Sequence, residues 1–299
     1  MDGFVAGELK DGRRKAENVL NRCLITLDAD HIPSGQTTKI LGLISGLGCA
    51  YTVYSTRKHC SDKPRLRLII PIDRTLKTDE YEPIARRIAS FIGLEILDSS
   101  TFEASRLMYW PSCSKDSEFV FKYEDKPFAS ADGILGMYRN WKDVNEWPKI
   151  PNEAEIIKTE ITKQKDPLEK DGIVGAFCRV YDIYQAIATF LPDVYEPGDK
   201  PDKFTYRLGS VANGAAVYGD GKWLYSFHET DPASRTLCNS FDLIRIHKFG
   251  SLDDDAKPGT PTNRLPSYIA MNKFALEDID VLKEYEGQKL EKAKEEFSQ

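Results

Sequence analysis

The chain has 299 residues, of which 41% are hydrophobic and 11% aromatic, and its formal net charge at pH 7 is −6. This composition supports packed cores in one large or two ordinary domains and excludes a disordered chain. The negative charge excludes a protein coated with cations for nucleic acid. It leaves room for a local basic groove, because a site that holds metal ions is often acidic itself.

Targeting signals and cysteine pairs are absent from the sequence. No apolar run approaches the length that spans a bilayer, and residues 1–7 lack the basic segment and apolar core of a signal peptide. Six cysteines are scattered along the chain, and none form a C-x-x-C pair. This pattern indicates the reduced thiols of an intracellular protein. We therefore expect no membrane partner.

The first half of the chain alternates strand-like and helix-like segments. Short apolar runs typical of strands occur at residues 24–27, 49–54, 66–72, 106–110 and 118–123. Helix-like segments occur at residues 37–47 and 79–91, and Ile84, Ile88 and Phe91 in the second recur at helical spacing. The mixture predicts an α+β fold with a sheet that is at least partly antiparallel.

The composition changes after Trp147. Residues 148–170 are charged and contain three prolines, which indicates a linker or a solvated helix. An aromatic-rich segment follows, then a Pro/Gly/Asp-rich stretch and a charged helix. The expected parts are a catalytic domain at 1–147, a linker at 148–170, an accessory ribbon–helix domain at 171–250, and a connector with a C-terminal helix at 251–299.

Two aspartates, Asp28 and Asp30, end the first strand-like run. Side chains alternate along a strand, so both carboxylates project from one face. Two like charges that close repel each other and resist burial, unless a divalent cation lies between them. Alone, this pair is better explained by a solvated Asp-rich turn, and the residues that follow reverse that interpretation.

A basic strand follows the second strand-like run. Arg65 and Arg67 alternate with apolar residues, so both guanidinium groups face one side of the strand, where they can grip phosphate oxygens. His59 can donate a hydrogen bond to a phosphate or transfer a proton. A solvated basic hairpin is the alternative, and for Arg57 and Lys58 both interpretations stay open. For Arg65 and Arg67 we favour phosphate binding, because paired cations between core positions are a poor choice for solubility alone.

A third acid, Asp98, also follows an apolar run. By itself it could cap a short helix or form an Asx-turn, with Ser99 and Ser100 in support. Arg106 lies eight positions further and could pair with a surface acid. Alone, neither residue identifies a site.

In this order, the motifs resemble the archaeo-eukaryotic primase superfamily of nucleotidyltransferases. Longer segments are similar to phage and prophage proteins of the virulence-associated E type, at residues 13–15, 27–30, 63–71, 106–112 and 239–244. Those proteins are primase or primase-polymerase modules, usually joined to a C-terminal helicase. The resemblance covers nearly the whole chain and implies a primase-like catalytic core with a mixed or antiparallel sheet, a smaller α+β domain and a C-terminal helix.

The resemblance also implies roles for single residues. Asp28, Asp30 and Asp98 would be catalytic and hold two divalent ions, Mg²⁺ or Mn²⁺. Ser55 and His59 match a motif whose common form is Ser-x-His, although three residues separate them here, which leaves the role of Ser55 open. The residues expected to bind the NTP or dNTP are Ser55, His59, Lys63, Arg65, Arg67 and Arg106.

The implied function is a metal-dependent DNA primase or primase-polymerase that copies a single-stranded DNA template in phage or mobile-element replication. A replicative helicase would be its partner, and the cytoplasm of a bacterial or phage-infected cell its location. The first residues resemble sequence that lies inside longer relatives, so we expect a shortened chain or a split gene product. A non-catalytic DNA-binding or helicase-recruiting module and a metal-dependent nuclease are the alternatives. The complete set of three acids favours the enzyme, and the basic strand favours a triphosphate substrate.

The accessory domain has the outline of a zinc ribbon without its ligands. Only His228 and Cys238 could bind zinc, with His247 further on, and a structural zinc needs four close ligands. We therefore expect no structural zinc. No G-x-x-x-x-G-K-[ST] motif occurs, so a P-loop ATPase is not expected. Aromatic and cationic residues that could stack with single-stranded bases, or form a small aromatic core, are Tyr206, Arg207, Tyr218, Trp223, Tyr225, Phe227 and Arg235.

Overall fold

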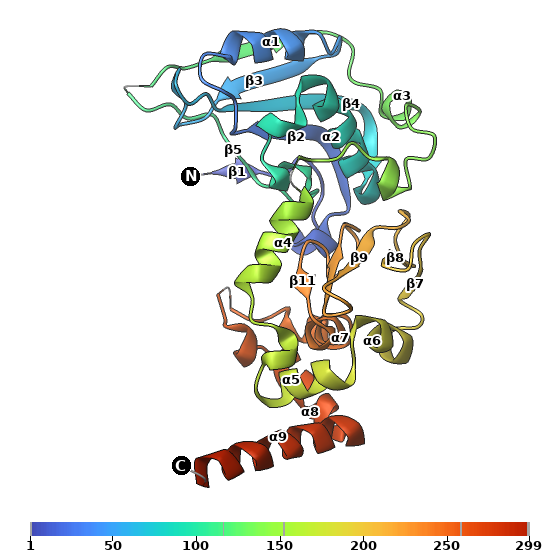
Figure 1. Ribbon diagram of the computed structural model, residues 1–299. Helices are drawn as coiled ribbons and strands as arrows, with labels where there is room; N and C mark the ends of the chain where they lie inside the picture. The colour runs from blue at the N-terminus through green and yellow to red at the C-terminus, as the bar shows by residue number, and fades with distance from the viewer. Residues whose placement is uncertain (1, 116, 152, 258, 298–299) are drawn as a thin grey trace. The chain divides into compact units, whose positions relative to one another are not determined.

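The computed structural model describes residues 2–115, 117–151, 153–257 and 259–297 (Figure 1). The chain forms two compact units, Met1–Glu153 and Ala154–Gln299. The α+β class expected from the sequence is confirmed, and the sheets are antiparallel. None of the helices in the described residues combines the length and the apolar character that crossing a membrane requires.

The first unit is built on a four-stranded antiparallel sheet. In spatial order its strands are β2 (Asn21–Ala29), β4 (Leu66–Lys77), β3 (Tyr51–Ser55) and β6 (Phe121–Glu124). Its helices are α1 (Thr37–Ser45), α2 (Thr78–Ile92) and α3 (Ala131–Leu135), and α2 packs against β2. A small ribbon pairs β1 (Gly3–Phe4) with β5 (Met108–Tyr109). Every strand and helix expected in this half occurs, with shifted ends.

The core of this unit follows the apolar alternation of its strands. Ile25 and Leu27 of β2 and Ile70 of β4 are almost completely buried. Asp79 and Glu80 lie in the first turn of α2, where the backbone N–H of Lys77 donates to Glu80 Oε2 at 2.8 Å. These polar contacts begin α2 directly after β4, so the helix that covers β2 is connected without a loop.

The second unit combines a five-stranded sheet with six helices among its described residues. The strand order is β11 (Leu237–Cys238), β10 (Trp223–Ser226), β9 (Ala215–Tyr218), β8 (Lys203–Tyr206) and β7 (Tyr195–Pro197). The helices are α4 (Glu153–Lys163), α5 (Gly172–Val180), α6 (Ile183–Phe190), α7 (Ser240–Phe249), α8 (Pro266–Glu277) and α9 (Ile279–Phe297). Helix α4 lies inside the segment expected as a linker or solvated helix. Helix α5 packs against α9, so the C-terminal helix belongs to the same compact unit.

The aromatic residues of this unit form a core. Tyr206, Trp223 and Phe227 are 6%, 2% and 7% exposed. Trp223 and Phe227 pack with Ile157 of α4, and Arg235 pairs with Glu229. The stacking interpretation is therefore wrong for these three rings, because both faces of the sheet are covered: Tyr206 packs in the main core of the unit, and Trp223 and Phe227 pack on the opposite face.

The histidines of the second unit belong to hydrogen-bonded networks. His228 Nε2 accepts the backbone N–H of Tyr206 at 3.1 Å. His247 Nε2 lies 2.9 Å from the Tyr195 hydroxyl and 3.2 Å from a carboxylate oxygen of the buried Asp231. The expectation that no zinc binds here remains a prediction.

Candidate functional site

The register of β2 and β4 places the two aspartates opposite the two arginines. Asp28 is the direct cross-strand partner of Arg67. Arg67 Nε and Nη2 both donate to Asp28 Oδ2 at 3.4 Å, and Arg65 Nη1 donates to Asp30 Oδ2 at 2.9 Å. Each pair was expected to face one side of its own strand, and the structure shows that the two pairs face each other.

Asp98 and Arg106 approach the same place from the segment after α2. The backbone N–H of Asp98 donates to the carbonyl oxygen of Asp28 at 2.9 Å. Arg106 Nη2 lies 3.9 Å from Asp28 Oδ2 and 3.8 Å from Asp98 Oδ2, so two carboxylates share one guanidinium group. Asp98 also caps the short helix Ser99–Phe102 by accepting the Ser100 N–H at 2.9 Å. We call the following six residues the acid–arginine face: Asp28, Asp30, Arg65, Arg67, Asp98 and Arg106.

Buried polar groups that sequence reasoning missed hold Asp28 in place. The Thr101 hydroxyl accepts the Asp28 N–H and donates to the Thr26 carbonyl, both at 2.9 Å. The Tyr81 hydroxyl lies 3.2 Å from the carbonyl oxygens of Thr26 and Thr101. The guanidinium carbon of Arg22 lies 4.2 Å from the centre of the Tyr81 ring. The sequence shows only that Arg22 and Thr26 lie in or beside an apolar run, and their complete burial appears only in the folded structure.

The two neighbouring acids differ in their electrostatics. Burial raises the pKa of Asp28 above its ordinary value, the charge of Arg67 opposes this, and the charge of Asp30 adds to it. Burial also acts to raise the pKa of Asp98, but hydrogen bonds from Ser100 outweigh it and leave this pKa below its ordinary value. Asp98 is therefore readily ionised, whereas Asp28 ionises against the cost of its own burial.

A divalent cation fits part of this arrangement. Asp28 is 3% exposed, and its Oδ1 is a buried oxygen with no hydrogen-bond partner among the described residues. Within the same residues, no three His, Cys, Asp or Glu side chains are grouped as a metal site, and Asp30 is held by Arg65. Mg²⁺ commonly takes only one or two protein carboxylates and completes its shell with water and phosphate. Asp28 and Asp98 supply such a set, and metal binding by all three acids stays a prediction.

The other expected nucleotide-binding residues have different environments. His59 is buried, and its Nδ1 accepts the backbone N–H of Arg65 at 3.0 Å, so a neutral ring carries its proton on Nε2. The buried Ser55 hydroxyl accepts the Val120 N–H at 2.9 Å and ties β3 to the segment before β6. Lys63 is exposed in the turn before β4. Of these three, His59 is the one built into the acid–arginine face through the backbone of Arg65.

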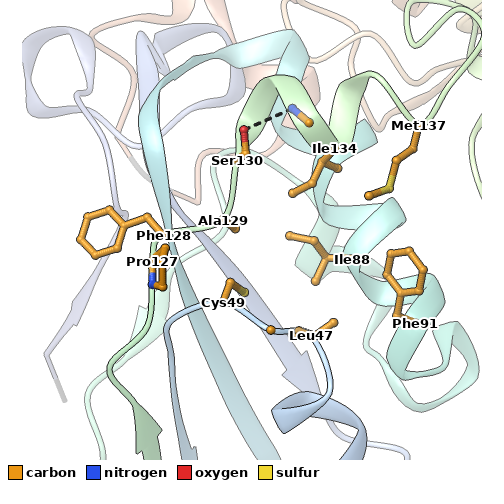
Figure 2. Close-up of a pocket in the computed structure, with 12 residues that line it drawn as sticks. Leu47, Cys49, Ile88, Phe91, Pro127, Phe128, Ala129, Ser130, Ile134 and Met137 are labelled. Carbon is orange, nitrogen blue, oxygen red and sulfur yellow. Dashed lines mark hydrogen bonds between the residues drawn. The ribbon is translucent and has the colours of Figure 1, made fainter.

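An apolar cavity of about 320 Å³ opens elsewhere on the first unit (Figure 2). Ile88 and Phe91 of α2 line it together with Ile134 and Met137 of α3 and the turn after it. No charged side chain of the described residues lines this cavity. A nucleoside triphosphate would lack counter-charges there, so the acid–arginine face is the better candidate for chemistry.

The family comparison concerns the unit that carries this face. A family model described as the VapE N-terminal domain matches residues 1–150. Among solved structures, the chain is similar to the AEP domain of the primase-polymerase (PrimPol) of cyanophage S-2L. The identity is 12%, the match covers 45% of this chain and 68% of that chain, and the TM-score is 0.33, which is too low to establish the fold. No curated protein matches the chain.

Proposed function

We propose that this chain, which belongs to the family of the VapE N-terminal domain, is a primase-like nucleotidyltransferase of phage or mobile-element replication. It would add nucleotides from NTP or dNTP on a single-stranded DNA template, with a replicative helicase as partner. The acid–arginine face carries this proposal, because it gathers three carboxylates and three guanidinium groups on one side of the sheet. Nucleotidyl transfer requires both kinds of group, anions to hold metal ions and cations to neutralise the triphosphate.

The ion pairs of this face can exchange partners. Arg65 and Arg67 present planar guanidinium groups that bind phosphate oxygens as well as carboxylates. When they turn to a triphosphate, Asp28 and Asp98 are the residues that would hold divalent ions. Such ions, when bound, activate an attacking 3′-hydroxyl and stabilise the departing pyrophosphate. The His59 Nε2–H would donate to a phosphate oxygen, since its Nδ1 is already an acceptor.

A direct assay tests this function. The full chain is incubated with single-stranded DNA, labelled NTP or dNTP, and Mg²⁺ or Mn²⁺, and the products are sized on a denaturing gel. We expect products from the unmodified chain and none from Asp28→Asn. The matched control is Asp132→Asn, which also removes an arginine-paired carboxylate but lies outside the face and is 79% exposed. Equal synthesis by Asp28→Asn and the unmodified chain would refute the assignment of the site.

One observation favours a non-catalytic DNA-binding or helicase-recruiting module as the second candidate. Each of the three aspartates already has an arginine within 4 Å, so the arginines alone balance the charge of the aspartates and no metal ion is needed for that. If the chain is a module of this kind, Asp28→Asn and the unmodified chain should bind single-stranded DNA equally well, and neither should make product with Mg²⁺ or Mn²⁺.

A further inference from the structure

An aromatic ladder runs along the edge strand β6 of the first unit. Phe119, Phe121 and Tyr123 are 53%, 53% and 64% exposed. The ring centres of Phe119 and Phe121 are 6.4 Å apart with planes within 7° of parallel, and Tyr123 follows at 6.1 Å from Phe121. Phe121 and Tyr123 project from one face of β6, and Phe119, just before the strand, stacks on Phe121, so the three rings form a continuous exposed row. Three adjacent exposed rings contribute little to the core and indicate a binding surface.

The sheet register connects this row to the acid–arginine face. Asp28 is opposite Arg67, Arg67 is opposite Tyr54, and Tyr54 is opposite Phe121. Residues directly opposite each other in antiparallel strands project from the same side of the sheet. The ladder therefore lies on the same side as the acids, three strands away, or about 14 Å at the usual strand spacing.

The segment that crosses between them is also aromatic. The carbonyl oxygen of Tyr109 accepts hydrogen bonds from the Tyr54 hydroxyl at 2.8 Å and from Arg67 Nη1 at 3.1 Å. The Tyr109 ring is 40% exposed, and its neighbour Trp110 is 54% exposed and lies 4.7 Å from the ring centre of Phe4. An exposed ring thus also lies beside Arg67, whose guanidinium carbon is 5.6 Å from the centre of the Tyr109 ring.

Two exposed cations lie near the ladder, and one exposed acid, Glu118, directly precedes it. Arg57 and Lys58 are exposed in the turn after β3, and neither has an ion-pair partner in the described parts of the chain. The Ser117 hydroxyl contacts the Arg57 carbonyl oxygen at 3.5 Å, so this turn lies beside the segment that leads into Phe119. The β6 carboxylate, Glu124, alternates to the other side of the strand and is paired with Lys126.

We propose that this ladder, Phe119, Phe121 and Tyr123, stacks the unpaired bases of single-stranded nucleic acid and leads the strand to the acid–arginine face. The inference rests on the proposed function, for which it places the template. Ring faces accept any base, and the free cations beside them attract the backbone. Between residues 171 and 250, no aromatic side chain is as much as 40% exposed, so we place the template platform on β6 instead.

The test measures binding of a fluorescent oligo-dT to the full chain by anisotropy. Phe121→Ala should weaken binding by about 5- to 150-fold, the equivalent of about 1–3 kcal/mol for one stacked base. Phe121→Trp should bind as well as the unmodified chain. Phe121→Leu should bind as weakly as Phe121→Ala, because it keeps the apolar bulk but lacks a ring face. Phe128→Ala is the matched control, since Phe128 is 58% exposed and lines the apolar cavity instead.

Two outcomes overturn the ladder assignment. One is unchanged oligo-dT affinity in Phe119→Ala/Phe121→Ala with native circular dichroism. The other is a change of oligomeric state in that variant at unchanged affinity, which would make β6 a protein interface. The proposed function can fail independently of the ladder, because Asp28→Asn tests synthesis and leaves the three rings unchanged. If the unmodified chain makes no product but binding still depends on the rings, the function is wrong and the ladder stands.

Discussion

The variant Asp28→Asn separates two effects of the Asp28 carboxylate: the stability lost by burying it, and the binding of a divalent cation. Burial raises the pKa of Asp28, so the folded chain binds this proton more tightly than the unfolded chain does. The resulting contribution to stability is full below the unfolded-state pKa and is lost as the pH rises through the raised folded-state pKa. An asparagine is neutral throughout. We therefore expect Asp28→Asn to be at least as stable as the unmodified chain at pH 7, with a smaller difference at pH 4.

Divalent cations should reverse this order. A ligand at 100 times its Kd stabilises the folded state by about 2.7 kcal/mol. For a unit of about 150 residues, 1 kcal/mol corresponds to roughly 2–4 °C in Tm, so saturating Mn²⁺ should raise the Tm by about 5–10 °C. The buried Asp28 Oδ1 without a partner is the oxygen that makes this gain available. Asp28→Asn should lose most of the shift, because a neutral amide is a poor ligand for a hard cation.

Differential scanning calorimetry at pH 4 and pH 7, with and without Mn²⁺, measures both effects. Asp132→Asn should behave as the unmodified chain in all four conditions, since its carboxylate is exposed and distant from the face. An Asp28→Asn variant that is clearly less stable at pH 7 and still shows the full shift with Mn²⁺ would exclude Asp28 as a metal ligand. Such a result would make Asp28 a structural partner of the arginines.

Three further variants test the surroundings of Asp28. Arg67→Ala should weaken the binding of a fluorescent nucleotide at least tenfold through loss of a bidentate phosphate contact. Arg139→Ala is the control and should leave the affinity unchanged, since this side chain is 91% exposed and pairs with Glu146, outside the acid–arginine face. Equal nucleotide affinities of the two variants would show that Arg67 does not bind the nucleotide. His59→Asn keeps an acceptor in place of Nδ1 but has no Nε2–H, so we expect less synthesis in the gel assay at an unchanged Tm. Retained synthesis in this variant would exclude His59 from the site. Thr101→Val leaves the Asp28 N–H unsatisfied and should lower the unfolding free energy, measured in urea, by about 1–3 kcal/mol. Thr101→Ser keeps the hydroxyl and should retain the stability of the unmodified chain. An unchanged unfolding free energy in the valine variant would show that this hydrogen bond is dispensable.

Local alternation predicted much of the first unit. The pattern of apolar and charged residues showed that Arg65 and Arg67 share one face of their strand and that Asp28 does so with Asp30. It did not show that the two faces coincide, because that depends on the register between β2 and β4. Register is a non-local property, set by the packing of the whole sheet. The sequence therefore suggested which residues to expect in the candidate site but not how they pair.

The aromatic residues show the complementary limit of sequence reasoning. Alternation along a strand places a ring on one face, but only the neighbouring elements decide whether that face is covered. In the second unit, Ile157 of α4 packs with Trp223 and Phe227 and closes the surface. In the first unit, β6 has β3 as its one partner in the sheet, and Phe121 stays open. Alternation alone therefore could not show that these rings of the second unit are buried and those of β6 exposed.

The pairing of acids with arginines has a physical reason that also explains why the site is not a preformed metal cage. A buried carboxylate such as that of Asp28 needs a counter-charge in the absence of ligand, because an unpaired charge in the interior is strongly destabilising. Arg67 and Arg106 supply that charge at 3.4 and 3.9 Å, longer than a tight ion pair at about 2.8 Å. These loose pairs stabilise the face while leaving the guanidinium groups able to take phosphate oxygens. In contrast, Arg65 holds Asp30 at 2.9 Å, so ligand binding should rearrange the Asp28 side of the face before the Asp30 side.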